Sequence, residues 1–437
     1  MSWHAGEAIP RAQEVAEGLC RFLDASPSPF HAVDRAAALL GEQDFAEVSE
    51  TDPTPREPGR YLVRRSGSLV AWSTETAEGP TTPVRVVGAH TDSPNLRIKP
   101  HPDGSHAGWH TLGVEVYGGP LLTSWLDRDL GLSGRVAVRT AGGYEPRLFH
   151  TDEPLLRVSQ LAIHLDRSVM SEGVKLNPQQ HLAPHWALTD GPDFAAWLAD
   201  HVGADRGDVL GWDAMTHDLT PARRIGRDAD LLASARLDNL ATSYAGVRAL
   251  VHAADSPGPR PSVPVLALFD HEEVGSTSER GAQSTFLPAT LERVVLAAGG
   301  GREDYLRALA GSVVASGDMA HATHPHYADR HEPDHRVAMN GGPVLKVNAN
   351  LRYATDALGA AAFRLACDQA QVPMQTFVTR TDLPCGSTVG PMTAALTGVT
   401  TVDFGAPTLS MHSTREVCGV PDQAMYAGAL AAFLAPA

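Results

Sequence analysis

The stretch VPVLALFDHEEVG occupies residues 263–275 and joins a strand-like run to a cluster of ionisable side chains. The apolar run at 263–269 predicts a buried β-strand. It stops at Asp270, and buried charges are costly unless they are paired or bind a metal ion. Ligands bind at the carboxyl ends of strands in α/β sheets, so Glu272 and Glu273 become candidates for proton transfer and cation binding. Alone the pattern is ambiguous, because a Glu pair also occurs at the solvated start of a helix.

The composition describes a large protein without nucleic-acid or membrane features. The 437 residues are 43% hydrophobic, enough for two or three domain-sized units. The formal net charge of -16 argues against a nucleic-acid partner. No apolar run is long enough to cross a membrane, and the first residues do not resemble a signal peptide, so we expect a cytoplasmic protein. The four cysteines are too widely spaced for a disulfide framework or a zinc knuckle.

The pattern of predicted elements changes twice along the chain. Residues 1–96 and 231–437 alternate strand-like and helix-like segments, which predicts an α/β fold. Between them, residues 97–230 contain segments such as LSGRVAVRT that alternate like antiparallel strands, with Gly and Pro between them. We therefore predict an α/β body in two parts, interrupted by an inserted β-rich domain.

Side chains that can bind a cation follow several predicted strands of the body. The strand near residues 84–87 runs into His90 and Asp92, and the alternation of an extended chain puts both on the same side. This suits a metal-bound imidazole with a carboxylate near its other nitrogen. Asp238 opens a helix, where an N-cap is the ordinary role. Each residue is a weak signal alone, but together they make a set of two imidazoles and three carboxylates: His90, Asp238, Glu273, Asp318 and His412.

This set fits two zinc ions, with Asp238 shared between them. Two metal ions about 3.5–4 Å apart can activate a water molecule and polarise a substrate carbonyl. Glu272 is left over and can take the proton of that water and pass it to a leaving amine. No GxSxG nucleophile motif occurs. The residues therefore favour metal-assisted hydrolysis of an amide.

Seven motifs occur in order along the chain: AHTDSPNLRIKP, SARLDNL, FDHEEVGSTSERGA, SGDMAHATHPHY, GGPVLKVNANLRYA, DLPCGSTVGP and LSMHSTREVCG. In these motifs, and over almost its whole length, the chain resembles the M18 aminopeptidases, the aspartyl aminopeptidase family. The resemblance implies a dinuclear zinc exopeptidase fold, with a mixed sheet between helices that is split by a dimerisation domain. It also implies removal of N-terminal residues from peptides, typically Asp or Glu, and homo-oligomers that are tetrahedral dodecamers built from dimers.

The same resemblance assigns roles to individual residues. It implies that His90 and Asp318 hold one zinc, that Glu273 and His412 hold the other, and that Asp238 bridges them. Asp92 would orient His90, and Glu272 would be the general base and acid. Similar enzymes have a cis peptide after the bridging aspartate, so we expect one between Asp238 and Asn239. His164 would reach the active site of a partner subunit, and a zinc-ligand role for it is the alternative.

An acidic substrate side chain needs a cation in its pocket. Lys346 is our candidate, because the chain has few lysines and this one lies in a matched motif, while Arg352 and Arg415 are alternatives. His321 is the best candidate for substrate contact in a histidine-rich stretch that continues to His335. Further substrate contacts are expected from three residues of the matched motifs: Tyr353, Gly386 and Ser387.

Two features leave alternatives open. His271 stands where the family has asparagine, and it either faces the site as a third imidazole or points away. The function could also be that of a broader aminopeptidase, a related dinuclear zinc amidohydrolase, or an inactive assembly protein. Cobalt or manganese could replace zinc, because similar sites accept several divalent ions.

Overall fold

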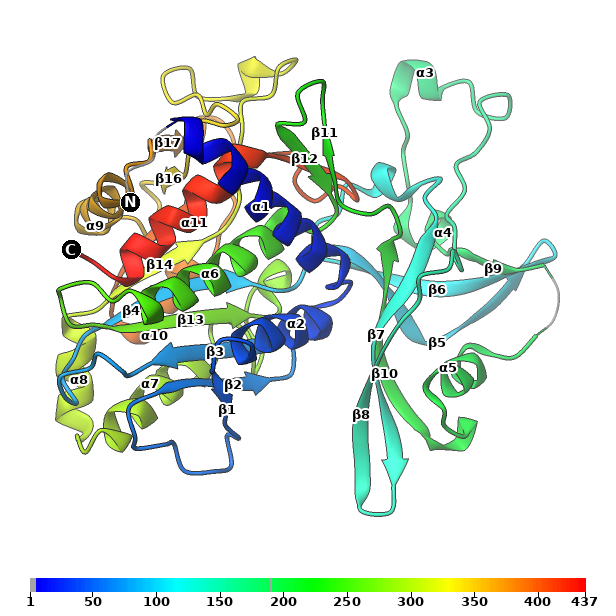
Figure 1. Ribbon diagram of the computed structural model, residues 1–437. Helices are drawn as coiled ribbons and strands as arrows, with labels where there is room; N and C mark the ends of the chain where they lie inside the picture. Colours follow the sequence, from blue (N-terminus) through cyan, green and yellow to red (C-terminus); the bar gives the residue numbers. More distant parts are fainter. Residues whose placement is uncertain (1–4, 189–190) are drawn as a thin grey trace.

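The computed structural model describes residues 5–188 and 191–437. It contains an α/β body and, beside it, a β-rich part that we call the insert, residues 95–218 (Figure 1). Within the described residues, no helix has the length and apolar character needed to cross a lipid bilayer.

The body is built on a nine-stranded mixed sheet, as the resemblance implied. Its central strands β13, β4, β14 and β18 are parallel to one another, whereas β3 and β16 pair antiparallel with β13 and β18. In spatial order the strands are β1 (Ala46–Glu47), β2 (Arg60–Arg65), β3 (Ser68–Ser73), β13 (Val263–Phe269), β4 (Val84–His90), β14 (Val313–Gly317), β18 (Thr400–Gly405), β16 (Val344–Val347) and β17 (Gln375–Val378).

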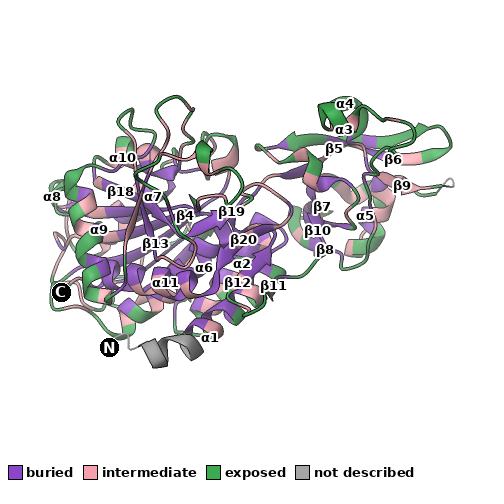
Figure 2. Ribbon diagram, turned by 90° about the horizontal axis from the view of Figure 1, so that it is seen from above, coloured by how far each residue is buried: buried purple, intermediate pink, exposed green. Residues whose placement is uncertain are grey.

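Helices cover both faces of this sheet. All seven residues of β13 are buried, because Leu266 and Leu268 face one helical layer while Val265 and Ala267 face the other. Figure 2 shows this buried centre. The first layer consists of α1 (Ala5–Asp24), α2 (Pro29–Gly41), α6 (Leu237–Asp255), α9 (Ala357–Ala370) and α11 (Val420–Leu434). The second consists of α7 (Phe286–Ala297), α8 (Arg302–Ala310) and α10 (Val389–Thr397).

A second, five-stranded sheet lies next to the carboxyl edge of the main sheet. Its strand β11 lies within the stretch predicted as the insertion, but it pairs with β12 of the body. The order is β11 (Arg223–Ile225), β12 (Leu231–Ser234), β20 (Glu416–Gly419), β19 (Pro407–Leu409) and β15 (Ala320–His321).

The insert has a hydrophobic core of its own, centred on residues such as Leu132 and Phe194. Its strands form an antiparallel sheet in the order β8 (Gly143–His150), β7 (Leu130–Thr140), β10 (Val209–Asp218), β5 (Asn95–His106), β6 (Trp109–Tyr117) and β9 (His185–Ala187). Its helices are α3 (Val169–Glu172), α4 (Pro178–His181) and α5 (Phe194–Val202). Short 3₁₀ helices complete the fold: η1 (Leu122–Trp125), η2 (Arg206–Asp208), η3 (Glu272–Val274) and η4 (Ala328–Arg330).

Candidate metal centre and active site

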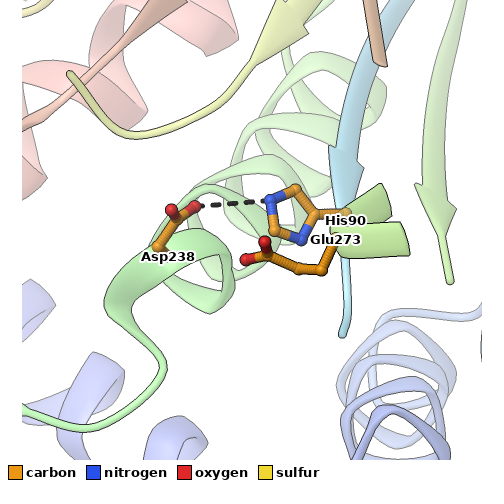
Figure 3. A group of neighbouring side chains, drawn as sticks. All are labelled: His90, Asp238 and Glu273. Atoms are coloured by element: carbon orange, nitrogen blue, oxygen red, sulfur yellow. Dashed lines mark ion pairs between the residues drawn. The ribbon is translucent and has the colours of Figure 1, made fainter. Parts of the chain in front are cut away.

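The five residues predicted to bind metal meet at the carboxyl edge of the main sheet. His90 is the last residue of β4, Asp318 follows β14, and Glu273 lies in η3 just after β13. Parallel strands end at the same edge of a sheet, so these three side chains converge. Asp238 begins α6 and His412 follows β19, and both reach the same place from the flanking elements. Figure 3 shows His90, Asp238 and Glu273 pointing toward one another.

Asp238 lies between the two imidazoles. Its Oδ1 is 3.3 Å from Nε2 of His90, and its Oδ2 is 3.5 Å from Nε2 of His412. Each imidazole has a second carboxylate: Asp318 Oδ1 lies 3.7 Å from His90 Nε2, and Glu273 Oε1 lies 3.3 Å from His412 Nε2. The cluster therefore divides into two groups that share Asp238.

The hydrogen bonds of the imidazoles suit a cation at this position. His90 donates through Nδ1 to the Asp92 carbonyl at 3.0 Å, and His412 donates through Nδ1 to the Gly119 carbonyl at 2.9 Å. With Nδ1 as the donor, each neutral ring turns the lone pair of Nε2 toward carboxylate oxygens. Asp238 Oδ1 and Glu273 Oε1 are buried without a hydrogen-bond partner. A metal ion would satisfy all of these atoms, so the residues fit zinc.

The pKa values reflect the same crowding of charge in the metal-free protein. Burial alone would lower the pKa of His412, but Asp238 and Glu273 raise it to about 10. Burial likewise opposes protonation of His90, but its contacts with neighbouring carboxylates, Asp238 first, raise its pKa well above the usual value. Burial raises the pKa of Glu272 to about 8. These shifts show a concentration of negative charge that favours a bound cation.

Asp92 connects a candidate ligand to the turn that carries the two glutamates. Its Oδ1 lies 3.5 Å from Nδ1 of His90, and its carboxylate accepts the backbone N–H groups of Glu272 and Glu273, each at 3.1 Å. Tyr117 donates its hydroxyl to Asp92 at 2.7 Å. The sequence indicated Asp92 but not Tyr117, because nothing in the pattern links this strand residue of the insert to the site.

A pocket of about 390 Å³ opens next to this cluster. Lys346 lies at its wall with a nearly buried side chain, its Nζ 3.5 Å from Asp318 Oδ2 and 5.3 Å from the centre of the Tyr353 ring. His321 is accessible to solvent, and its ring packs edge-on against Phe377. All of the predicted substrate residues line this pocket: His321, Lys346, Tyr353, Gly386 and Ser387.

The alternatives to Lys346 do not line the pocket. Arg352 is exposed and donates to the Gly386 carbonyl at 3.3 Å. Arg415 donates to the backbone carbonyls of Thr220, Pro221 and Ala233. Neither guanidinium is among the pocket-lining groups.

The extra histidines lie elsewhere. His271 turns away from the cluster, because its ring bonds Ser278 at 2.7 Å and Arg280 at 3.1 Å. Beyond His321, the histidine-rich stretch makes local contacts, such as that of His331 with the backbone N–H of His324. These rings are not part of the pocket wall.

His164 is not brought to the site within one chain. It lies in an exposed turn of the insert and is not among the residues that line the pocket. Its exposure excludes a position in the core of the single chain. Three neighbouring apolar side chains are also exposed: Leu161, Ile163 and Leu165.

Sequence reasoning missed Glu416. Its buried carboxylate accepts the backbone N–H of Asp238 at 3.0 Å and that of His412 at 2.7 Å. Burial and the nearby Asp238 raise the pKa of Glu416 to about 8. One sequence feature could have indicated Glu416: it is an acidic residue beside a short apolar stretch, within the matched motif LSMHSTREVCG.

The peptide bond between Asp238 and Asn239 is cis, as expected.

A mixed sheet between helices, with imidazoles and carboxylates gathered at its carboxyl edge, is the architecture of the zinc exopeptidases. Residues 22–434 match the sequence model of the family described as Aminopeptidase I zinc metalloprotease (M18). The chain belongs to this family and is an aminopeptidase, a hydrolase that acts on peptides.

Individual relatives agree with this assignment. A protein of Streptomyces coelicolor named "Probable M18 family aminopeptidase 2" is 52% identical over 423 residues, which cover 96% of this chain and 97% of that protein. A cryo-EM structure of the Ape4 and Nbr1 complex contains a chain with a TM-score of 0.93 and 36% identity, covering 99% of this chain and 87% of that one. The S. cerevisiae mApe1 dodecamer has a TM-score of 0.82 and 25% identity, covering 96% of each chain.

Proposed function

We propose that this aminopeptidase binds two zinc ions and removes N-terminal residues from peptides, with a preference for Asp and Glu. His90 and Asp318 would hold one ion, Glu273 and His412 the other, and Asp238 both. The observation that carries this proposal is the orientation of the imidazoles. Both donate through Nδ1 to a backbone carbonyl, so both Nε2 atoms face the shared Asp238.

When bound, the metal ions supply an activated water and polarise the substrate carbonyl. Glu272 would accept the proton of the water and deliver it to the departing amine. Asp92 would keep Glu272 in place, because it accepts the N–H of that residue. Glu272 therefore lies on a turn that Asp92 holds beside the proposed metal ligands, and this arrangement supports hydrolysis of a peptide bond.

Lys346 would select the acidic side chain of the substrate. Its ammonium group is nearly buried beside the ring of Tyr353 and has Asp318 as its acidic neighbour. A metal ion held by Asp318 would neutralise much of the charge of that carboxylate, so the ammonium group could pair with a substrate carboxylate. His321, Gly386 and Ser387 would complete the wall of the pocket.

The active enzyme would be a homo-oligomer, with the insert as its dimerisation domain. Leu161, Ile163 and Leu165 are exposed beside His164, and an exposed apolar group of this kind is typical of an interaction surface. His164 would act on the substrate in the partner subunit. The full assembly would be a tetrahedral dodecamer built from dimers, and the dodecamer of the mApe1 relative supports the number of subunits in this proposal.

Hydrolysis of aminoacyl-p-nitroanilides tests the specificity directly. Wild-type protein and Lys346→Ala would be compared on Asp, Glu, Leu, Ala and Lys substrates, with the zinc content of each protein measured in parallel. We expect Asp and Glu to lead in the wild type, and Lys346→Ala to lose at least about 30-fold in kcat/KM on these two alone, the loss of one buried charge pair. If Leu or Lys leads in the wild type, the enzyme is a broader aminopeptidase.

A further inference from the structure

Glu416 bridges two parts of the chain that the sequence keeps far apart. Its Oε1 accepts the backbone N–H of His412 at 2.7 Å, and its Oε2 accepts that of Asp238 at 3.0 Å. The residue is 2% exposed, so water does not compete for these bonds. The Glu416 carboxylate therefore fixes the distance between the backbone of Asp238 and the backbone of His412.

Glu416 lies in a strand that is paired with its neighbour. Glu416 begins β20, and its register partner in β12 is Ser234, which lies directly before the turn into α6. His412 lies in the loop before β20 and has few other tethers, chiefly the Nδ1 bond to Gly119 and the bond from the Leu121 N–H to its carbonyl. The side chains of His412 and Asp238 approach each other at 3.5 Å, but neither tether connects the backbone of His412 to that of Asp238. Glu416 supplies that connection.

We infer that Glu416 is a positioning residue for the metal centre, which holds Asp238 and His412 at the separation that one ion requires. This inference rests on the proposed metal site. Glu416 touches neither substrate nor metal and acts only through the two backbone N–H groups. Its loss should weaken the ion held by His412 and Glu273 more than the ion held by His90 and Asp318.

The test is Glu416→Gln, which keeps the size of the side chain but replaces one acceptor oxygen with an amide nitrogen that cannot accept. Partners of metal ligands typically contribute 10–100-fold to metal affinity. We expect one zinc to bind about 10–100-fold more weakly and the other to stay within a few-fold of wild type. Chelator competition and metal content would measure both affinities on the full-length protein.

Asp422 offers a matched control. It is also a buried carboxylate that accepts two backbone N–H groups, those of Asn340 at 2.6 Å and Gly342 at 2.8 Å. Neither Asp422 nor its partners line the pocket. Asp422→Asn should lower the thermal stability and leave both zinc affinities unchanged.

The zinc affinities of the two variants and of the wild type distinguish the possible results. If Glu416→Gln binds both ions as tightly as wild type, or if Asp422→Asn weakens zinc equally, the inference is overturned. If wild type itself binds fewer than two ions, the proposed dinuclear site fails instead. Should Glu416→Gln not fold, Glu416→Asp gives the answer, because it keeps both oxygens but withdraws them by one methylene. Weaker binding of one ion supports the inference, and unchanged binding of both rejects it.

Discussion

Asp92 joins two functions in a single side chain. It lies beside the Nδ1 of His90, and it also fixes the backbone of Glu272 and Glu273. A buried carboxylate can remain ionised when it accepts hydrogen bonds from three donors. Burial alone would raise the pKa of Asp92, but its contacts, with His90 first, lower that pKa below its usual value. The candidate base and a candidate ligand thus depend on the same anchor.

Replacement of Glu272 by Gln should abolish most of the activity. The amide has nearly the same shape but cannot carry a proton, so kcat should fall by about 10²–10⁴-fold. Steady-state kinetics on an Asp or Glu substrate would measure the loss. Zinc content serves as the control and should stay at the wild-type level, because Glu272 is not one of the proposed ligands. Activity near that of wild type would show that another group moves the proton.

The candidate ligands could be predicted from the sequence because the signal was local. His90, Asp318 and Glu273 each follow an apolar run, and parallel strands bring such ends together. Glu416 and Tyr117 could not be predicted in this way. Their roles come from hydrogen bonds to a backbone or to a side chain that is distant in sequence, and no periodicity reports such bonds.

Among the elements, the long central strands were predictable and the short ones were not. β13 is an apolar run of seven residues and β4 is a seven-residue strand rich in valine, whereas β15 and β19 have two and three residues and no pattern of alternation. Tertiary pairing alone defines such short strands. The five-stranded sheet, which carries Glu416, was therefore not expected.

The contact between α2 and the insert should weaken in acid. Burial lowers the pKa of His217 in β10 to about 3, and that of His31 in α2 to about 4. His217 contacts Ser133 through Nδ1 at 3.1 Å, and Ser133 donates to the carbonyl of Pro27, just before α2. Both histidines bind protons more readily in the unfolded chain, so their contribution is complete above about pH 6.5 and is lost as the pH falls toward 4.

Thermal unfolding of wild type and His217→Gln at pH 7.5 and pH 5 tests this expectation. At pH 5 the unfolded chain protonates His217 but the folded wild type does not. This difference lowers the free energy of unfolding by up to about 2 kcal/mol. The variant has no such group, so its melting temperature should fall less between the two pH values. Equal decreases in both proteins would assign the acid sensitivity to other groups.

At the scale of the whole molecule, the exposed apolar turn of the insert should govern assembly. Leu165 is 76% exposed in the single chain. Leu165→Glu would place a charge in the proposed dimer contact, which is costly to bury without a partner. We expect light scattering after size exclusion to show a shift toward monomers, together with loss of peptidase activity.

Leu358 on α9 is the matched control, because it is 71% exposed on the body rather than on the insert. Leu358→Glu should retain the dimer. A Leu165→Glu protein that assembles normally would exclude this turn from the interface, whereas assembly without activity would indicate that the turn acts mainly through the active site.

The order of the strands has a consequence for protein synthesis. β4 is made early, yet it lies between β13 and β14, which follow the insert, and His412 comes after all the strands of the main sheet in sequence. Chains emerge from the ribosome with the N-terminal part first. A nascent chain therefore cannot assemble the proposed metal centre before residue 412 has been made, so shorter nascent chains should have no peptidase activity.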